Sequence, residues 1–156
     1  MRSRRMRTVL ICALCIVLVF VLLLLSFCGT PKGEFQSEYG TRYYITSDEI
    51  ARLDVPASLS FGKEKKEFSL NVVYDYEVYS EDFERRIVMH LVRVEYGGED
   101  TAIKNLVASL NRDITAKNAQ VYDFAGLTLK AKTDATYTRG AGSVRINGEL
   151  LKRVEK

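Results

Sequence analysis

The residues that could carry acid–base or metal chemistry are few and lie apart along the chain. His90 is the only histidine among the 156 residues, and a metal site or a nucleophilic triad needs partners that a single histidine lacks. Asp75 and Glu77 stand two positions apart, the spacing of solvent-facing carboxylates on one face of a strand. The sequence contains neither a glycine-rich phosphate loop nor a G-x-S-x-G elbow. We therefore expect no catalytic residue, no metal and no cofactor, and a protein that is not an enzyme.

The three cysteines all lie in the first 28 residues. Cys12 and Cys15 have the C-x-x-C spacing of redox and zinc sites. They stand in an apolar run, however, where reactive thiolates are disfavoured and small apolar packing explains them better. Cys28 ends the sequence L-S-F-C, which resembles a bacterial lipobox except that Phe27 stands where that motif has a small residue. Cys28 is therefore a candidate lipidation site.

The aromatic composition is unusual, with nine tyrosines and no tryptophan. Tyr74 and Tyr76 lie on the apolar face of one expected strand, and Leu129 and Tyr137 lie on the apolar face of a later one. On a curved sheet these four side chains are candidates for lining an aromatic ligand pocket. Ordinary core packing is the alternative, because tyrosine favours strands in any case.

A long apolar segment near the N-terminus suggests a membrane location. Residues 8–27 are 20 residues without charge, glycine or proline, which as a helix would span about 30 Å, the thickness of a hydrocarbon core. Four arginines precede this segment, and the positive-inside bias would place them in the cytoplasm. A signal anchor, a cleaved signal peptide and a lipoprotein signal ending at Cys28 remain as alternatives.

The segmentation that follows has four parts. Residues 1–7 would be a basic cytoplasmic N-terminus, residues 8–27 a transmembrane helix or signal segment, residues 28–41 a spacer, and residues 42–156 an extracytoplasmic domain. The formal net charge of +3 comes from the N-terminal arginines, and without them 19 basic residues face 20 acidic ones. A nearly neutral domain argues against nucleic-acid binding, which needs a basic patch.

Strands dominate the expected domain. Residues 68–79 alternate apolar and polar side chains over six repeats, which predicts a strand with one buried face. Residues 80–84 form a polar turn, and residues 86–96 are rich in Val and Ile, which favours a second strand, although a helical stripe through Phe83 also runs there. Residues 127–138 alternate again. Val144–Ile146 and Glu149–Leu151 flank an Asn-Gly pair, which predicts a hairpin with a type I′ turn.

Two helices are expected among these strands. Ser47 could cap a short helix that ends by Asp54, because Pro56 disfavours helical geometry before it. Asp100 or Thr101 could cap a longer helix whose apolar positions fall on one face. Those positions are Ile103, Leu106, Val107, Leu110 and Ile114.

These patterns predict an α+β fold, in which an N-terminal single transmembrane helix precedes a small domain with a curved antiparallel sheet and one or two helices on one face. Barrel-like closure is the alternative. The function they favour is a non-catalytic, membrane-tethered extracytoplasmic accessory or assembly and interaction domain. Its partners would be the lipid bilayer through residues 8–27 and another membrane or envelope protein, with no nucleic acid. The alternative function is a lipoprotein that binds a small molecule or lipid in the tyrosine-lined pocket.

Overall fold

The computed structural model describes residues 11, 13–21 and 31–155. The chain divides into two compact units, Met1–Thr30 and Pro31–Lys156. In the first unit, residues 11 and 13–21 are helical.

The single-pass membrane location predicted from residues 8–27 is not supported. Among the described residues, no helix combines the length and the apolar character that crossing a bilayer requires. The transmembrane helix and the single-pass topology predicted from the sequence are therefore corrected. Residues 1–7 and Cys28, the candidate lipidation site, lie outside the described residues.

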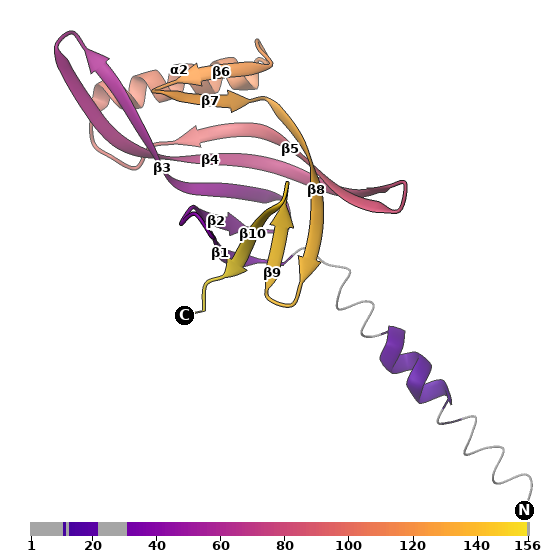
Figure 1. Cartoon of the computed structure of the whole chain (residues 1–156). Coiled ribbons are helices and arrows are strands. Elements are labelled where there is room, and N and C mark those ends of the chain that lie inside the picture. Colours follow the sequence, from indigo (N-terminus) through magenta and orange to yellow (C-terminus); the bar gives the residue numbers. More distant parts are fainter. Residues whose placement is uncertain (1–10, 12, 22–30, 156) are drawn as a thin grey trace, which may run out of the picture. The chain divides into compact units, whose positions relative to one another are not determined.

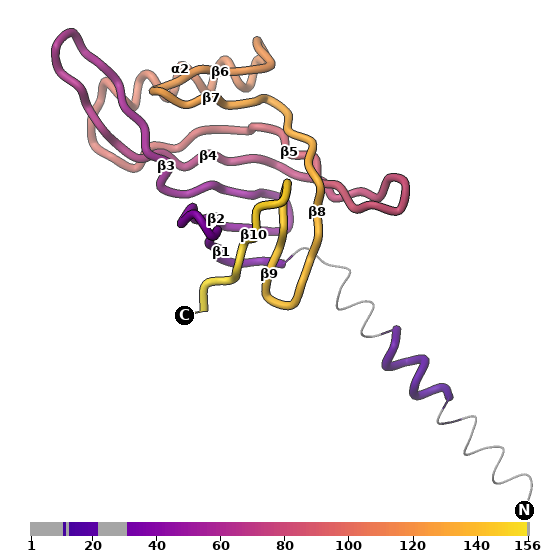
Figure 2. The backbone as a smooth tube through the Cα atoms, in the orientation of Figure 1, coloured from indigo at the N-terminus to yellow at the C-terminus, as the bar shows by residue number. Residues whose placement is uncertain are grey.

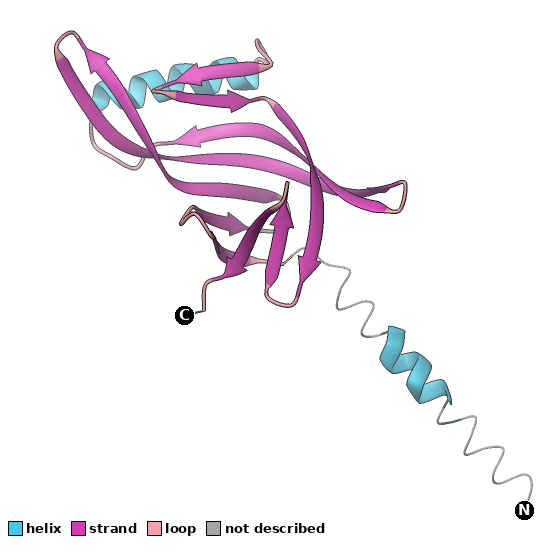
Figure 3. Ribbon diagram, viewed as in Figure 1, coloured by secondary structure: helices cyan, strands magenta, loops and turns pink. Residues whose placement is uncertain are grey.

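In the second unit, eight strands form a closed antiparallel barrel in the order β1-β10-β9-β8-β5-β4-β3-β2 (Figures 1 and 3). The β6–β7 hairpin and helix α2 (Thr101–Thr115) lie together beside one end of the long strands β3 to β5. The strands are β1 (Gly33–Ser37), β2 (Arg42–Ile45), β3 (Glu49–Phe61), β4 (Glu64–Glu81), β5 (Glu84–Glu95), β6 (Val121–Phe124), β7 (Leu127–Lys130), β8 (Lys132–Gly140), β9 (Ser143–Ile146) and β10 (Glu149–Arg153).

The predicted α+β fold with a curved antiparallel sheet is wrong, because the sheet closes into a barrel, and β1 is the reason. Part of the expected spacer, residues 28–41, forms this strand, in which Phe35 pairs with Tyr43 of β2 on one side and with Arg153 of β10 on the other. The first and last strands therefore meet and close the sheet. Phe35 itself is fully buried in the barrel, which accounts for an apolar residue in an otherwise polar stretch.

The helix expected over residues 47–54 is also wrong. The hydroxyl Oγ1 of Thr46 accepts hydrogen bonds from the backbone N–H groups of Asp48 and Glu49 at 3.3 and 3.0 Å, so the capping chemistry makes a tight turn instead. The chain then enters β3, where Ile50 pairs with Tyr74 of β4. Long-range pairing with β4 therefore overrides the local helical signal.

Two apolar clusters share the interior. The barrel cluster fills the closed part of the sheet, and the cap cluster lies where α2 and the β6–β7 hairpin cover the ends of β3 to β5. Buried residues of the barrel cluster are Phe35, Ile45, Ile50, Tyr76, Ile87, Ala135, Tyr137, Val144 and Leu151. Those of the cap cluster are Val55, Ala57, Leu70, Val72, Leu91, Val94, Ile103, Val107, Leu110, Ile114, Tyr122, Ala125 and Leu129.

One face of β4 serves both clusters, as the alternation over residues 68–79 predicted. Leu70 and Val72 belong to the cap cluster and Tyr76 to the barrel cluster. Irregular register between Arg52 and Val55 of β3, and at Val73 of β4, marks where the strands bend from one cluster to the other.

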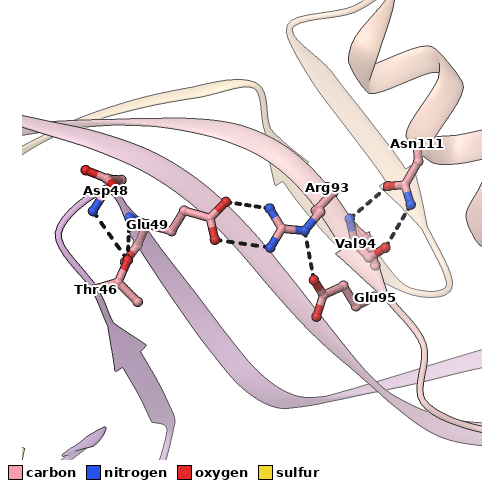
Figure 4. Close-up of polar contacts among 7 residues, drawn as sticks. All are labelled: Thr46, Asp48, Glu49, Arg93, Val94, Glu95 and Asn111. Atoms are coloured by element: carbon pink, nitrogen blue, oxygen red, sulfur yellow. Dashed lines mark hydrogen bonds and ion pairs between the residues drawn. The ribbon is translucent and has the colours of Figure 1, made fainter. Parts of the chain in front are cut away.

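An ion pair crosses the outer face of the sheet at this bend (Figure 4). Arg93 of β5 donates two hydrogen bonds to the carboxylate of Glu49 on β3, at 2.5 and 3.1 Å, and a third to Glu95 at 2.8 Å. These bonds lower the pKa of Glu49 and raise that of Arg93. Val73 of β4 lies between the two strands and is buried although it faces outward. We attribute its burial to the arginine side chain that spans it.

The margins of the sheet beyond the barrel are covered in three ways. Pro56 has no N–H group, so β3 presents no hydrogen-bond donor at that point of its outer margin. Further along this margin, the N–H of Ser58 donates a hydrogen bond to the carbonyl of Ala125 at 3.0 Å. On β5, the side-chain amide of Asn111 both accepts from the N–H and donates to the carbonyl of Val94, each at 2.8 Å (Figure 4). Asn111 thus takes the place of a neighbouring strand.

Asn111→Ala should lower the free energy of unfolding by about 1 to 3 kcal/mol, because both backbone groups of buried Val94 lose their partner. Urea denaturation measures this. The control is Asn105→Ala on the exposed face of the same helix, which should change stability little. Equal effects of the two substitutions would contradict the role given to Asn111.

Candidate functional site

The four residues predicted to line a ligand pocket do not meet in one place. Tyr76 and Tyr137 lie in the barrel cluster, whereas Leu129 lies in the cap cluster and Tyr74 packs against it. The hydroxyl of Tyr76 donates to the carbonyl of Thr46 at 2.7 Å. Burial raises the pKa of Tyr74 and Tyr137. The four side chains act as core residues, the alternative weighed for them from the sequence.

The other residues singled out from the sequence lie on the outer surface. Asp75, Glu77 and His90 are all exposed, and Asp75 faces His90 across β4 and β5. Within the described part of the chain, no group of three or more metal-binding side chains comes together.

The feature that stands out is the turn between β4 and β5. Strand β3 pairs with β4 only as far as Asp75, and β8 pairs with β5 only from Arg86 onward. Residues 79–86 therefore continue as a two-stranded extension, which we call the arm, with Tyr79 opposite Arg86 and Glu81 opposite Glu84. Figure 2 shows the arm running out past β8.

At the tip of the arm, Phe83 is an unfavourable residue type for the backbone conformation it adopts. Asp82 and Phe83 have φ values of 48° and 68°, so both are in the left-handed region, as a type I′ turn requires. A bulky residue in that region costs roughly 1 to 2 kcal/mol. Phe83 is also fully exposed, so this cost is not offset by burial of the ring.

Two other hairpins of this chain have glycine at the position that Phe83 occupies in the arm. The turns Ala125-Gly126 and Asn147-Gly148 also have positive φ at both positions, and each has glycine at the second one. Phenylalanine at the corresponding position of the arm has a steric cost that glycine would not have. Local strain of this kind is characteristic of functional positions.

The base of the arm is held to β8 by a polar network. The hydroxyl of Tyr79 donates to one carboxylate oxygen of Asp134 at 2.8 Å, and Arg86 donates to the other at 2.9 and 2.7 Å. Both donors lower the pKa of Asp134, the tyrosine hydrogen bond being the larger cause. Because Tyr79 of β4 and Arg86 of β5 both donate to Asp134, the network links the two strands of the arm to β8.

Charged residues, most of them acidic, flank the exposed ring in the sequence. Glu81, Asp82 and Glu84 lie within two positions of Phe83, as does Arg85. Glu81 lies 3.9 Å from Arg86, while no ion pair is found for Asp82 or Glu84 within the described residues. An exposed aromatic side chain with an acidic surround suits an apolar recess in a positively charged surface.

The sequence holds a signal for this site beyond the polar turn predicted over residues 80–84 and the helical stripe through Phe83. A phenylalanine in an otherwise charged turn between two alternating strands was the informative feature, because a folding requirement alone favours Gly or Asn there.

Comparisons with protein-family models, with curated proteins and with solved structures gave no match.

Phe83→Gly should raise the free energy of unfolding by about 1 kcal/mol, because glycine adopts positive φ without steric cost. Chemical denaturation of the two proteins measures the difference. Phe83→Ala removes the ring but keeps the strain and should stay near the wild type. Gly148→Ala, at the equivalent position of the β9–β10 turn, should be destabilising. A less stable Phe83→Gly variant would show that the ring contributes to the fold.

Asp134 should also make stability depend on pH. Its pKa is lower in the folded protein than in the unfolded chain, so its contribution is present above about pH 4, the usual value for Asp, and is lost as pH falls through the folded value. Asp134→Asn should therefore be less stable than the wild type at pH 7, and the difference should shrink on acidification. Tyr79→Phe should shift the pKa of Asp134 upward in an NMR titration, and an unchanged midpoint would contradict the network.

Proposed function

We propose that the chain is a non-catalytic protein-interaction module and that the arm is its contact site. The observation that carries this proposal is the strained and fully exposed Phe83 at the tip of the arm. Aromatic side chains contribute strongly to protein interfaces when they fill a recess on the partner. The strain at this position is then offset in the complex rather than in the free domain.

Rigidity of the arm supports the same function. Tyr79, Arg86 and Asp134 hold its base through three hydrogen bonds. A contact residue that is already positioned loses less conformational freedom on binding, so more of its interaction energy is available as affinity.

Two other modes of interaction fit the structure less well. Addition of a partner strand at the outer margins of β3 and β5 is opposed by Pro56, by the Ser58–Ala125 hydrogen bond and by Asn111. Binding of the tip to an anionic lipid surface is opposed by the carboxylates around Phe83.

Affinity capture tests the proposal, with the full-length chain used to recover its partner protein from the cells that produce this chain. Wild type and a Tyr39→Ser control, which removes an exposed aromatic side chain from the β1–β2 turn, should recover the same partner protein. Phe83→Gly should lose that partner at least tenfold while folding at least as stably. Identical recoveries with all three proteins would overturn the proposal.

A further inference from the structure

The surface of the barrel has hollows that could receive a tip such as Phe83, and their charges differ. A hollow of about 350 Å³ beside Tyr96 has the carboxylates of Asp54 and Glu95 in its lining. One of about 530 Å³ on α2 has Arg112 as its single charged residue. A third, of about 290 Å³, lies where β1 meets β10 and contains both Lys152 and Arg153.

The hollow between β1 and β10 combines apolar and cationic side chains. Leu150 and Val154 supply its apolar surface. Lys152 is exposed and has no ion pair within the described residues. Glu38 is its one acidic residue, so its lining carries a net positive charge.

The second cation of this hollow is held in place. Arg153 donates a hydrogen bond from Nη2 to the carbonyl of Lys32. Its guanidinium also lies against Gly33, where a β-carbon would approach Nη2 to 3.4 Å and where φ is +123°. The positive φ requires glycine at this position, whereas a β-carbon would make only ordinary van der Waals contact with the arginine. A cation fixed in this way loses little freedom when it meets an anionic group.

We infer that the partner of the arm is a second copy of this chain, with Phe83 of one copy seated between Leu150 and Val154 of the other. This inference rests on the proposed function of the arm. The number of cations favours this hollow, because Lys152 and Arg153 could both face Asp82 and Glu84 beside the ring, whereas the hollow on α2 has Arg112 alone. The hollow beside Tyr96 would set carboxylates against carboxylates.

The contact is heterologous, since the arm and the hollow are different surfaces of the molecule. After one contact has formed, the copy that supplied its arm keeps an unused hollow, and the copy that supplied its hollow keeps an unused arm. Such contacts produce a ring if the rotation between copies closes, and an open chain of copies if it does not.

Photo-crosslinking with the full-length chain tests the inference. One population carries p-benzoylphenylalanine in place of Phe83 at natural isotope abundance, and a second population is wild type and uniformly labelled with ¹⁵N. Irradiation of the mixture should join the light peptide containing position 83 to the heavy peptide containing residues 150–154. Mass spectrometry separates this product from links within one copy.

Charge reversal in the heavy population gives the direction of the contact. Lys152→Glu should reduce the crosslink at least fivefold, whereas Lys130→Glu, at an exposed site on β7, should not change it. Glu84→Lys in the light population should restore the crosslink to the Lys152→Glu copy. This rescue excludes a folding defect as the cause of the loss.

The outcomes separate the two proposals. Crosslinks that fall elsewhere on the heavy chain, or a lack of rescue, overturn the inference of a second copy. If position 83 links to no copy of the chain while Phe83-dependent capture of a different protein persists, this inference fails and the proposed function stands. If neither a copy nor another protein depends on Phe83, both fail.

Discussion

The hydrogen bonds between β1 and β10 determine which strand edges of the sheet are free to pair with another chain. They join the first and last strands of the sheet and leave the barrel without a free edge. Where β3 and β5 run on beyond the barrel, the margins are covered by Pro56, the carbonyl of Ala125 and the amide of Asn111. The arm is different, since its two strands pair with each other beyond β3 and β8. The exposed aromatic residue stands at the end of that extension.

Local patterns predicted a good part of this fold. The alternation over residues 68–79 identified β4 and its buried face, and the Asn-Gly pair fixed the last hairpin, in which Ile146 pairs with Glu149 and Val144 with Leu151 as expected. Asp100 caps α2, and four of the five apolar residues expected on its inner face are buried. These features depend on neighbours in the sequence, which a single sequence displays directly.

The features that were missed depend on distant partners or on conformation. Five residues of β1 with one buried apolar side chain carry little periodic signal, yet their pairing with β10 closes the sheet into a barrel. Residues 127–138 alternate without a break, but Leu129 and Tyr137 belong to β7 and β8 and point into different clusters. For the candidate site, the sequence predicted the β4–β5 turn but not the role of Phe83 at its tip, because the positive φ of Phe83 is visible only in the structure.

The pairing of Phe35 with Arg153 also sets the order of events during synthesis. The two residues are separated by roughly 120 positions, so at about 5 to 20 residues per second a ribosome needs on the order of ten seconds between them. During that interval β1 can pair with β2 while its other margin has no partner from its own chain. Nascent copies translated side by side on one messenger would then offer each other the same open margin, and only the arrival of β10 removes it.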